Sequence, residues 1–293
     1  MAGMMRGLLW KLHKTGVDMY EQYWKLDRIP FANTGDQDFF FRSHTHQAGL
    51  LKLQYVIENQ HGAGVLVGGV GAGKTYLVTQ LSQVMSESAG PFVHVVYPQM
   101  SAPEMLSFLA VELGAESADA EPAQVGLDRT LHAIERQLQE HFRQKRHPVI
   151  VVDEAHLIED QGLLQSLQLL LNYRARPDIE FSLFLVGERS LLAKLQRMPQ
   201  FDDRIAVRMM LRSLNIQETR DYIAHRLKTA GAQTAIFSPE AIEQVFEIAR
   251  GVPRRINRLC DMALLIGFAD GIPLISADEV EAVAQEVAMA VPD

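Results

Sequence analysis

The stretch Gly64-Val-Leu-Val-Gly68-Gly-Val-Gly71-Ala-Gly73-Lys74-Thr75 runs from an apolar segment into a glycine-rich loop that ends in Lys-Thr. From Gly68 to Thr75 it matches the pattern G-x-x-x-x-G-K-[ST], in which backbone N–H groups converge on phosphate oxygens. The helix expected to follow adds the positive end of its dipole. An ordinary glycine-rich turn does not need Lys-Thr where a helix begins. The pattern therefore predicts a site for the phosphates of a nucleotide.

The loop also predicts which residues carry the chemistry. In loops of this kind the lysine ammonium reaches the β- and γ-phosphates, and the hydroxyl of the next residue is a ligand of Mg²⁺. Lys74 is therefore expected to bind the nucleotide and act in catalysis, and Thr75 to bind the metal. The predicted cofactors are ATP and Mg²⁺. The predicted nucleotide-binding residues are Gly68, Gly69, Val70, Gly71, Ala72, Gly73, Lys74, Thr75 and Tyr76.

A second motif, Pro148-Val-Ile-Val-Val-Asp153-Glu154-Ala-His156, lies further along the chain and runs from β-branched residues into two carboxylates. A buried parallel strand beside the P-loop strand would bring Asp153 to the Mg²⁺ and Glu154 to the attacking water. Taken alone, the same residues also suit a strand followed by the start of a helix. Together with the P-loop they predict Asp153 as a metal ligand and Glu154 as a catalytic residue.

Strand and helix patterns alternate along the first two thirds of the chain. Buried strands are expected near residues 92–97, 180–187 and 209–211. This alternation predicts an α/β fold, a parallel sheet flanked by helices. Beyond about Arg212 the strand signal stops, and a small all-α domain of four helices is expected. The expected parts are a leader and arm at 1–43, the nucleotide-binding domain at 44–212 and a helical lid at 213–293.

The N-terminal part is rich in aromatic residues between Met19 and Phe41. These are expected to pack an arm onto the nucleotide-binding domain, either as packing alone or as a wall for the nucleotide base. Before them lies a short basic amphipathic stretch that lacks the features of a secretory signal. His44 and His46 resemble half a metal site, but with no cysteine or carboxylate cluster near in sequence they are interpreted as the start of a helix.

Composition narrows the function classes. The net charge of −8 argues against a surface that is basic overall, so nucleic-acid binding would need a local basic patch. The single cysteine, Cys260, lies in a helical pattern and is interpreted as a buried thiol in a reducing compartment. No apolar run approaches the ~20 residues that a membrane span requires. We therefore expect a cytoplasmic protein, peripheral to the inner membrane only through a partner.

The motifs together resemble those of AAA+ ATPases, and within that class those of the general secretion pathway protein A (ExeA/GspA) type. The resemblance covers nearly the whole chain from Met19, and the same module is similar to transposition ATPases of the TniB/TnsC kind. The residues that carry it are Met19-Tyr-Glu, Pro30-Phe31, Phe39-Phe-Phe41, the P-loop, Asp153-Glu-Ala-His156, Leu185-Val-Gly187, Gln200 to Arg204, Glu218-Thr-Arg-Asp-Tyr-Ile-Ala-His-Arg226 and Gly251-Val-Pro-Arg-Arg-Ile-Asn257.

The resemblance implies catalytic roles for two arginines. Arg204 matches the arginine finger that reaches the γ-phosphate held by a neighbouring subunit, with Arg208 as its nearest rival. Arg254 matches the sensor 2 arginine, which couples the lid to the nucleotide. The family commonly has a polar sensor 1 residue at the end of the fourth strand, where this chain has Gly187. Glu188, Asn172 or a neighbour is expected to substitute, or Glu154 acts alone.

The function implied is an AAA+ ATPase that hydrolyses Mg-ATP as a homo-oligomer and remodels or assembles a protein partner complex in secretion, pilus or envelope biogenesis. The alternative is a transposition-type regulator that uses ATP to assemble on DNA, with weak basic candidates at 143–146 and 254–258. A nucleotide switch without hydrolysis also stays open. A helicase of the DEAH type is rejected, because only about eighty helical residues remain for its second domain.

Overall fold

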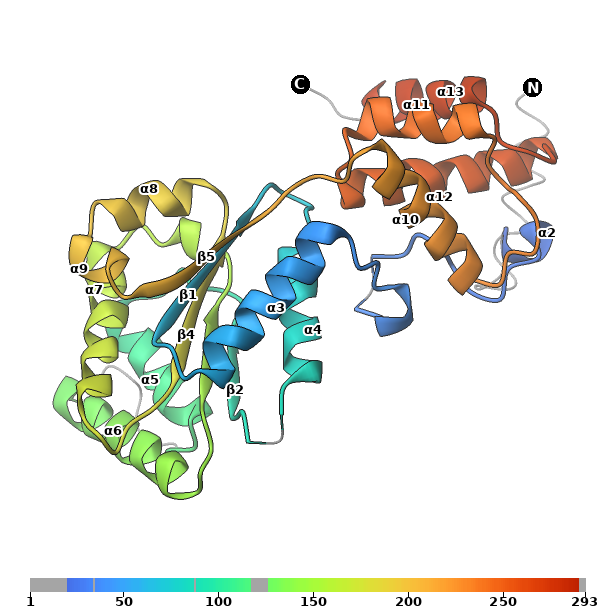
Figure 1. The fold of residues 1–293 in the computed structure, drawn as a ribbon. Helices are drawn as coiled ribbons and strands as arrows, with labels where there is room; N and C mark the ends of the chain where they lie inside the picture. The colour runs from blue at the N-terminus through green and yellow to red at the C-terminus, as the bar shows by residue number, and fades with distance from the viewer. Residues whose placement is uncertain (1–19, 34, 87, 117–125, 290–293) are drawn as a thin grey trace. The chain divides into compact units, whose positions relative to one another are not determined.

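The computed structural model describes residues 20–33, 35–86, 88–116 and 126–289. The basic N-terminal stretch lies outside these residues. The chain forms two compact units: His44–Arg212 is one, and the described residues up to Ser43 together with those from Ser213 form the other. We call them the P-loop unit and the helical unit, and Figure 1 shows the elements of each.

The P-loop unit contains a five-stranded sheet in the order β2-β3-β4-β1-β5, and every neighbouring pair is parallel. This confirms the predicted α/β fold. Apolar and often β-branched residues fill β1, β3 and β4, which are buried along their whole length. The strands are β1 (Ala63–Gly68), β2 (Phe92–Val95), β3 (Val149–Val152), β4 (Ser182–Gly187) and β5 (Ile205–Leu211).

Helices cover both faces of this sheet. Figure 1 shows α3 and α4 on one face and α5, α6 and α7 on the other, so the unit has three layers. Strand residues alternate between the two helical layers: Val65 packs in the core cluster of α5 to α7, whereas Gly64 faces Val56 of α3. The helices are α3 (His44–Glu58), α4 (Lys74–Val84), α5 (Ala102–Glu112), α6 (Leu127–Arg143), α7 (Gln161–Leu170), α8 (Ser190–Gln196) and α9 (Pro199–Asp202), with 3-10 turns η3 (Ala155–Leu157) and η4 (Leu171–Ala175).

The second strand is shorter than the sequence indicates. Val93 and Val95 are buried, but β2 ends at Val95, and the next two side chains leave the core. Val96 is 63% exposed and Tyr97 is 65% exposed. The expectation of a strand through residue 97 was therefore wrong, because an apolar run indicates burial without showing where pairing to β3 stops.

The helical unit has its own apolar core. Cys260 is fully buried in it, as expected, and burial raises the pKa of its thiol. A single parallel bridge, Phe237 with Ile275, joins two loops of the unit. Its elements are α2 (Glu21–Trp24), η1 (Gln37–Phe39), α10 (Ile216–Thr229), α11 (Pro239–Ala249), α12 (Pro253–Asp270) and α13 (Ala277–Met289).

The aromatic arm belongs to the helical unit, which corrects the expectation that it packs on the nucleotide-binding domain. Trp24 and Phe31 are buried in the core cluster of the helical unit, and the Trp24 indole donates to the Leu264 carbonyl at 3.0 Å. Arg226 of α10 is also buried, stacks over the Phe39 ring at 4.7 Å and donates to backbone carbonyls of the arm. Aromatic residues signal burial, but the sequence does not say against which surface.

Gly251 tests the close backbone approach between the loop before α12 and Leu214. Its φ of +68° suits glycine, and an added Cβ would lie 1.9 Å from the Leu214 carbonyl oxygen. We expect Gly251→Ala to destabilise the helical unit by at least ~2 kcal/mol, since backbone strain adds to a clash that no side-chain rotation relieves. Gly271→Ala is the matched control, because its φ is +67° with nothing within 4 Å of the added Cβ. Equal thermal unfolding midpoints for the two variants would contradict the close approach.

Candidate nucleotide-binding site

The P-loop connects β1 to α4, at the carboxyl end of the sheet. Gly71 and Gly73 have φ values of +73° and +90°, which a residue with a side chain adopts only with strain. The His46 ring from α3 lies 2.9 Å from the Ala72 carbonyl oxygen, and an added Cβ on Gly73 would come within 2.9 Å of the same ring nitrogen. His46 therefore fixes the loop from behind, a role that the sequence did not reveal.

The mouth of the loop is open to solvent. Gly69 and Val70 are exposed, and an added Cβ on Gly69 would meet nothing within 4 Å. Thr75 is exposed and Tyr76 half-buried at the start of α4. The predicted nucleotide-binding residues from 68 to 76 thus combine solvent-accessible loop residues with the N-terminus of α4, an arrangement suited to an anion.

Lys74 is the buried charge of the site. Its side chain belongs to a residue only 6% exposed, and Nζ donates to the carbonyls of Gly68 and Gly69 at 3.3 Å each. Within the described parts of the chain, no carboxylate lies within ion-pair distance of it. A buried ammonium whose partners are neutral carbonyls is costly, and an anion in the loop would compensate it. The residues present therefore fit a phosphate group.

Thr75 and Asp153 meet across the two motifs. The Thr75 hydroxyl donates to Asp153 Oδ2 at 2.7 Å, and Asp153 directly follows β3 with only 1% of its surface exposed. Hydroxyl and carboxylate oxygens are the ligands that Mg²⁺ prefers, and one or two protein ligands suffice beside phosphate oxygens and water. The pair therefore also fits Mg²⁺.

Asp153 is held in its ionised form. Burial by itself would raise the pKa of this carboxyl, but the nearby His94 ring and hydrogen bonds from the Thr75 hydroxyl and the Glu154 N–H outweigh it and lower the pKa. His94, from β2, has Nε2 3.5 Å from Asp153 Oδ2. The sequence did not point to this histidine, because nothing local in an apolar strand shows which neighbouring strand its side chain faces.

Glu154 has a strained backbone. Its φ of +48° is uncommon for a residue with a side chain, and its N–H donates to Asp153 Oδ1 at 2.8 Å. Such residues concentrate at functional sites. Its carboxylate, 39% exposed, lies 3.3 Å from Nδ1 of His156, whose Nε2 lies 3.4 Å from Glu188. The candidate base is therefore beside the predicted metal ligand, Asp153, but open to water.

Arg204 lies at the amino end of the parallel strands, whereas the P-loop lies at their carboxyl end. Ile205, which begins β5, pairs with Ala63 at the start of β1, whereas the loop follows Gly68 at its end. About five strand residues, roughly 16 Å, separate these ends, more than an arginine side chain spans. In this structure Arg204 donates to the Gln168 carbonyl and to the Asn172 side chain. It cannot reach the P-loop of its own chain.

The other predicted residues lie elsewhere. Arg208, on β5, forms an ion pair with Asp202 at 2.6 Å. Asn172, one of the residues expected to substitute for sensor 1, accepts a hydrogen bond from Arg204. Arg254 is exposed at the start of α12 in the helical unit, so its sensor 2 role stays a prediction.

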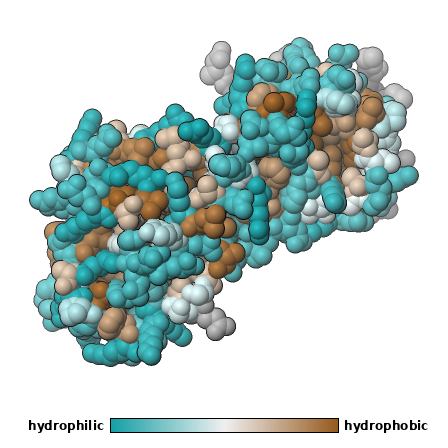
Figure 2. All heavy atoms as spheres, viewed as in Figure 1, coloured by the Kyte–Doolittle hydropathy of each residue, from teal (hydrophilic) through white to brown (hydrophobic). Residues whose placement is uncertain are grey.

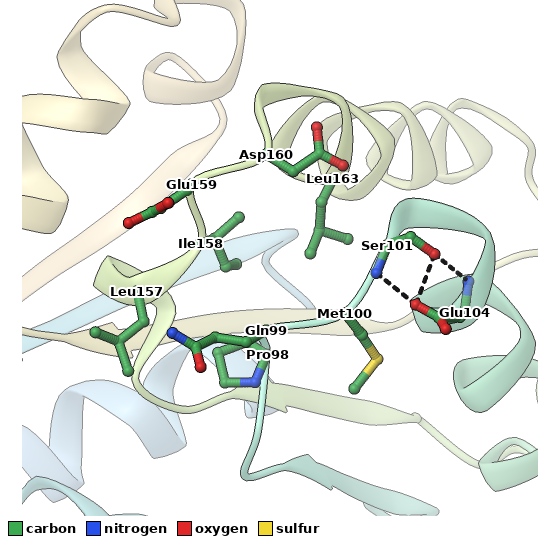
Figure 3. Close-up of a pocket in the computed structure, with 10 residues that line it drawn as sticks. All are labelled: Pro98, Gln99, Met100, Ser101, Glu104, Leu157, Ile158, Glu159, Asp160 and Leu163. Atoms are coloured by element: carbon green, nitrogen blue, oxygen red, sulfur yellow. Dashed lines mark hydrogen bonds between the residues drawn. The ribbon is translucent and has the colours of Figure 1, made fainter.

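A separate hollow lies beside these motifs. It has a volume of about 450 Å³ and is lined by residues 98–101 and 157–160 with Glu104 and Leu163 (Figure 3). Ser101 and Glu104 close a reciprocal hydrogen-bonded cap at the start of α5. No P-loop residue lines the hollow, so it is distinct from the expected phosphate site.

The fold and the loop define a class: an α/β module that carries a P-loop, with the parallel strand order and helical flanks described above. Residues 57–195 match the model of a family described as AAA domain. Nucleotide binding is what this family implies.

The chain is also similar to individual proteins and solved structures. The chain is 29% identical over 273 residues to general secretion pathway protein A of Aeromonas hydrophila, which covers 92% of this chain and 48% of that protein. The chain thus spans about half the length of that relative. Among solved structures it resembles the ORC2 protein of Aeropyrum pernix, with a TM-score of 0.68, 17% identity and coverage of 91% of this chain and 73% of that one. It also resembles Cdc6p from Pyrobaculum aerophilum, with a TM-score of 0.69, 16% identity and coverage of 90% of this chain and 74% of that one. These two share the fold.

Two further features are absent from the described residues. None of their helices combines the length and the apolar character that a bilayer crossing requires. No group of three or more histidine, cysteine, aspartate or glutamate side chains among them is arranged to hold a metal ion. His44 begins α3, in line with the interpretation of that histidine pair as a helix start.

Proposed function

We propose that the chain binds Mg-ATP and hydrolyses it. The observation that carries the proposal is a buried ammonium, Lys74, one residue from a hydroxyl that is 2.7 Å from a buried aspartate on the neighbouring motif. The hydrogen-bond partners of the Lys74 ammonium are neutral backbone carbonyls, and no described carboxylate lies within ion-pair distance of it, whereas a metal-bound polyphosphate would compensate its charge and use the Asp153 carboxylate.

Each residue then has a distinct task. Lys74 and the N–H groups from Gly69 to Thr75 bind the phosphates, while Thr75 and Asp153 hold Mg²⁺. Mg²⁺ bound there would neutralise charge on the phosphate oxygens during transfer. Glu154, exposed beside Asp153, accepts a proton from the attacking water.

The position of Arg204 supports an assembly in which copies of the chain complete each other's sites. Because its own P-loop lies beyond reach, Arg204 acts as an arginine finger only on a neighbouring copy. We propose a homo-oligomer in which the guanidinium leaves Gln168 and Asn172 to meet a γ-phosphate across the interface.

Arg204→Ala tests this arrangement. We expect ATP affinity to stay within twofold, because the residue does not contact the P-loop of its own chain. Turnover under assembling conditions should fall ~1,000-fold, as for other arginine fingers. Arg208→Ala is the control, since its ion pair with Asp202 engages it. Full turnover in Arg204→Ala together with loss in Arg208→Ala would transfer the role to Arg208.

We further propose a protein partner of a secretion, pilus or envelope complex, with the chain cytoplasmic or held at the inner membrane by that partner. The similarity to general secretion pathway protein A supports this role. The exposed Val96 and Tyr97 lie in the segment that leads into the hollow, whose lining includes Glu159 and Asp160. Exposed apolar side chains suit contact with a protein, and the nearby carboxylates would repel the phosphates of DNA.

One assay separates the assembly proposal from the DNA-dependent alternative. ATP turnover is measured against protein concentration, with and without duplex DNA. A specific rate that climbs with concentration and ignores DNA supports a self-assembling ATPase. A rate that rises only with DNA would favour the transposition-type role, with Arg254, Arg255 and Arg258 as the next residues to replace.

A further inference from the structure

We propose that His156 is a positioning residue that links Glu188, at the end of β4, to the candidate base Glu154, and that this chain of three side chains performs the water-positioning task for which the strand end itself has only Gly187. The inference rests on the proposed hydrolysis and assigns a further residue to it.

The geometry places one imidazole between two carboxylates. Nδ1 of His156 lies 3.3 Å from Glu154 Oε2, and Nε2 lies 3.4 Å from Glu188 Oε1. Only 12% of the His156 side chain is exposed, whereas the two carboxylates are 39% and 40% exposed. The ring is therefore the sheltered member, and it limits the orientations that the Glu154 carboxylate can adopt.

Gly187 permits this approach. An added Cβ at that position would lie 3.1 Å from the His156 backbone nitrogen and 3.2 Å from Nδ1. These separations are tighter than ordinary van der Waals contact, so a side chain there would displace the ring. Gly187 stands where the sequence comparison expected a polar sensor 1 residue. Because it has no side chain, it leaves the space that the His156 ring occupies.

The backbone of the histidine segment is also anchored. The Lys194 ammonium of α8 donates to the carbonyls of His156 and Ile158, the latter at 2.7 Å. This contact joins the segment after Glu154 to the helix after β4. A ring that lies within 3.4 Å of a carboxylate on each side, with its backbone held by Lys194, is pre-organised, and such positioning affects the rate more than binding.

The kinetic test uses His156→Gln, Glu188→Gln and the double variant. We expect His156→Gln to lower kcat by about 10- to 100-fold while the dissociation constant for Mg-ATP changes less than twofold. Because Glu188 acts through His156, the double variant should turn over at the rate of His156→Gln alone. If the losses in kcat of the two single variants multiplied in the double variant, the proposal would be overturned. His132→Gln is the control, since His132 pairs with Glu135 at 3.7 Å on the exposed face of α6.

A second readout needs neither nucleotide nor turnover. The ¹⁵N resonances of the His156 ring are assigned by difference against His156→Gln and followed in nucleotide-free protein. Glu154→Gln and Glu188→Gln should each shift them, because each removes the charge that faces one ring nitrogen. Resonances that move with neither variant would overturn the link.

The two readouts keep the claims distinct. A wild-type chain that binds Mg-ATP but hydrolyses none under assembling conditions would refute the proposed hydrolysis, and the side-chain link would then be decided by the ring resonances. Normal hydrolysis that is unaffected by His156→Gln would refute the positioning role alone.

Discussion

Lys74→Ala is expected to lower the affinity for ATP by at least ~100-fold. The ammonium would make charge-assisted hydrogen bonds to phosphate oxygens, each contributing about 1.5–3 kcal/mol, and alanine removes them all. Isothermal titration of the purified chain with Mg-ATP measures the loss. Lys52→Ala is the matched control, because Lys52 is exposed on α3. Unchanged affinity in Lys74→Ala would remove this residue from the site.

The same variant should leave the nucleotide-free protein as stable as the wild type or more so. Lys74 is buried with only backbone carbonyls from Gly68 and Gly69 as hydrogen-bond acceptors, so its removal abolishes a desolvation cost without breaking an ion pair. The thermal shift that ATP produces should disappear, because that shift follows ligand affinity. A variant that unfolds more easily before ligand is added would show instead that the lysine supports the loop.

Glu154→Gln is expected to reduce ATP turnover by roughly 100- to 10,000-fold while ATP binding persists. Glutamine preserves the size of the side chain but cannot accept the proton of the attacking water, and general-base catalysis contributes a factor of this order. Asp153 and Thr75 keep their 2.7 Å contact, so the phosphate and metal ligands stay in place. The measurement pairs initial rates of phosphate release with equilibrium binding of Mg-ATP.

Glu159→Gln is the control for this variant, since Glu159 is an exposed carboxylate in the same segment. Wild-type turnover in Glu154→Gln would assign the base to another group. Binding without turnover in the wild-type chain as well would support the nucleotide switch without hydrolysis, one of the alternatives that the sequence leaves open.

Local patterns predicted much of the fold and several site residues. The glycine-rich loop, the β-branched run before Asp153 and the helical periodicities beyond residue 212 each depend on neighbours in sequence. Such signals identify elements and the residues at their ends. They place Asp153 at the carboxyl end of a strand, and parallel strands bring that end to the edge where the P-loop lies.

Other contacts depend on residues far apart in the chain. His46 behind Ala72, His94 beside Asp153 and the aromatic arm against the helical unit have no local pattern that reveals them. A histidine in a helix or an apolar strand shows only which face it occupies. Which element covers that face follows from the strand order and the packing of helices on the sheet.

The sequence by itself determined which chemistry is proposed for this protein, because the spacing of Lys74 and Thr75 in a loop, and of Asp153 and Glu154 after a strand, is typical of a phosphate and metal site built from consecutive residues. The tertiary structure decided which groups support that site and which cannot reach it. The strand order β2-β3-β4-β1-β5 brings His94 beside Asp153. The parallel register of β5 with β1 puts Arg204 at the end of the strands opposite to the P-loop. Short-range patterns specify elements and their faces, whereas neighbours in space are chosen by packing between segments distant in the chain.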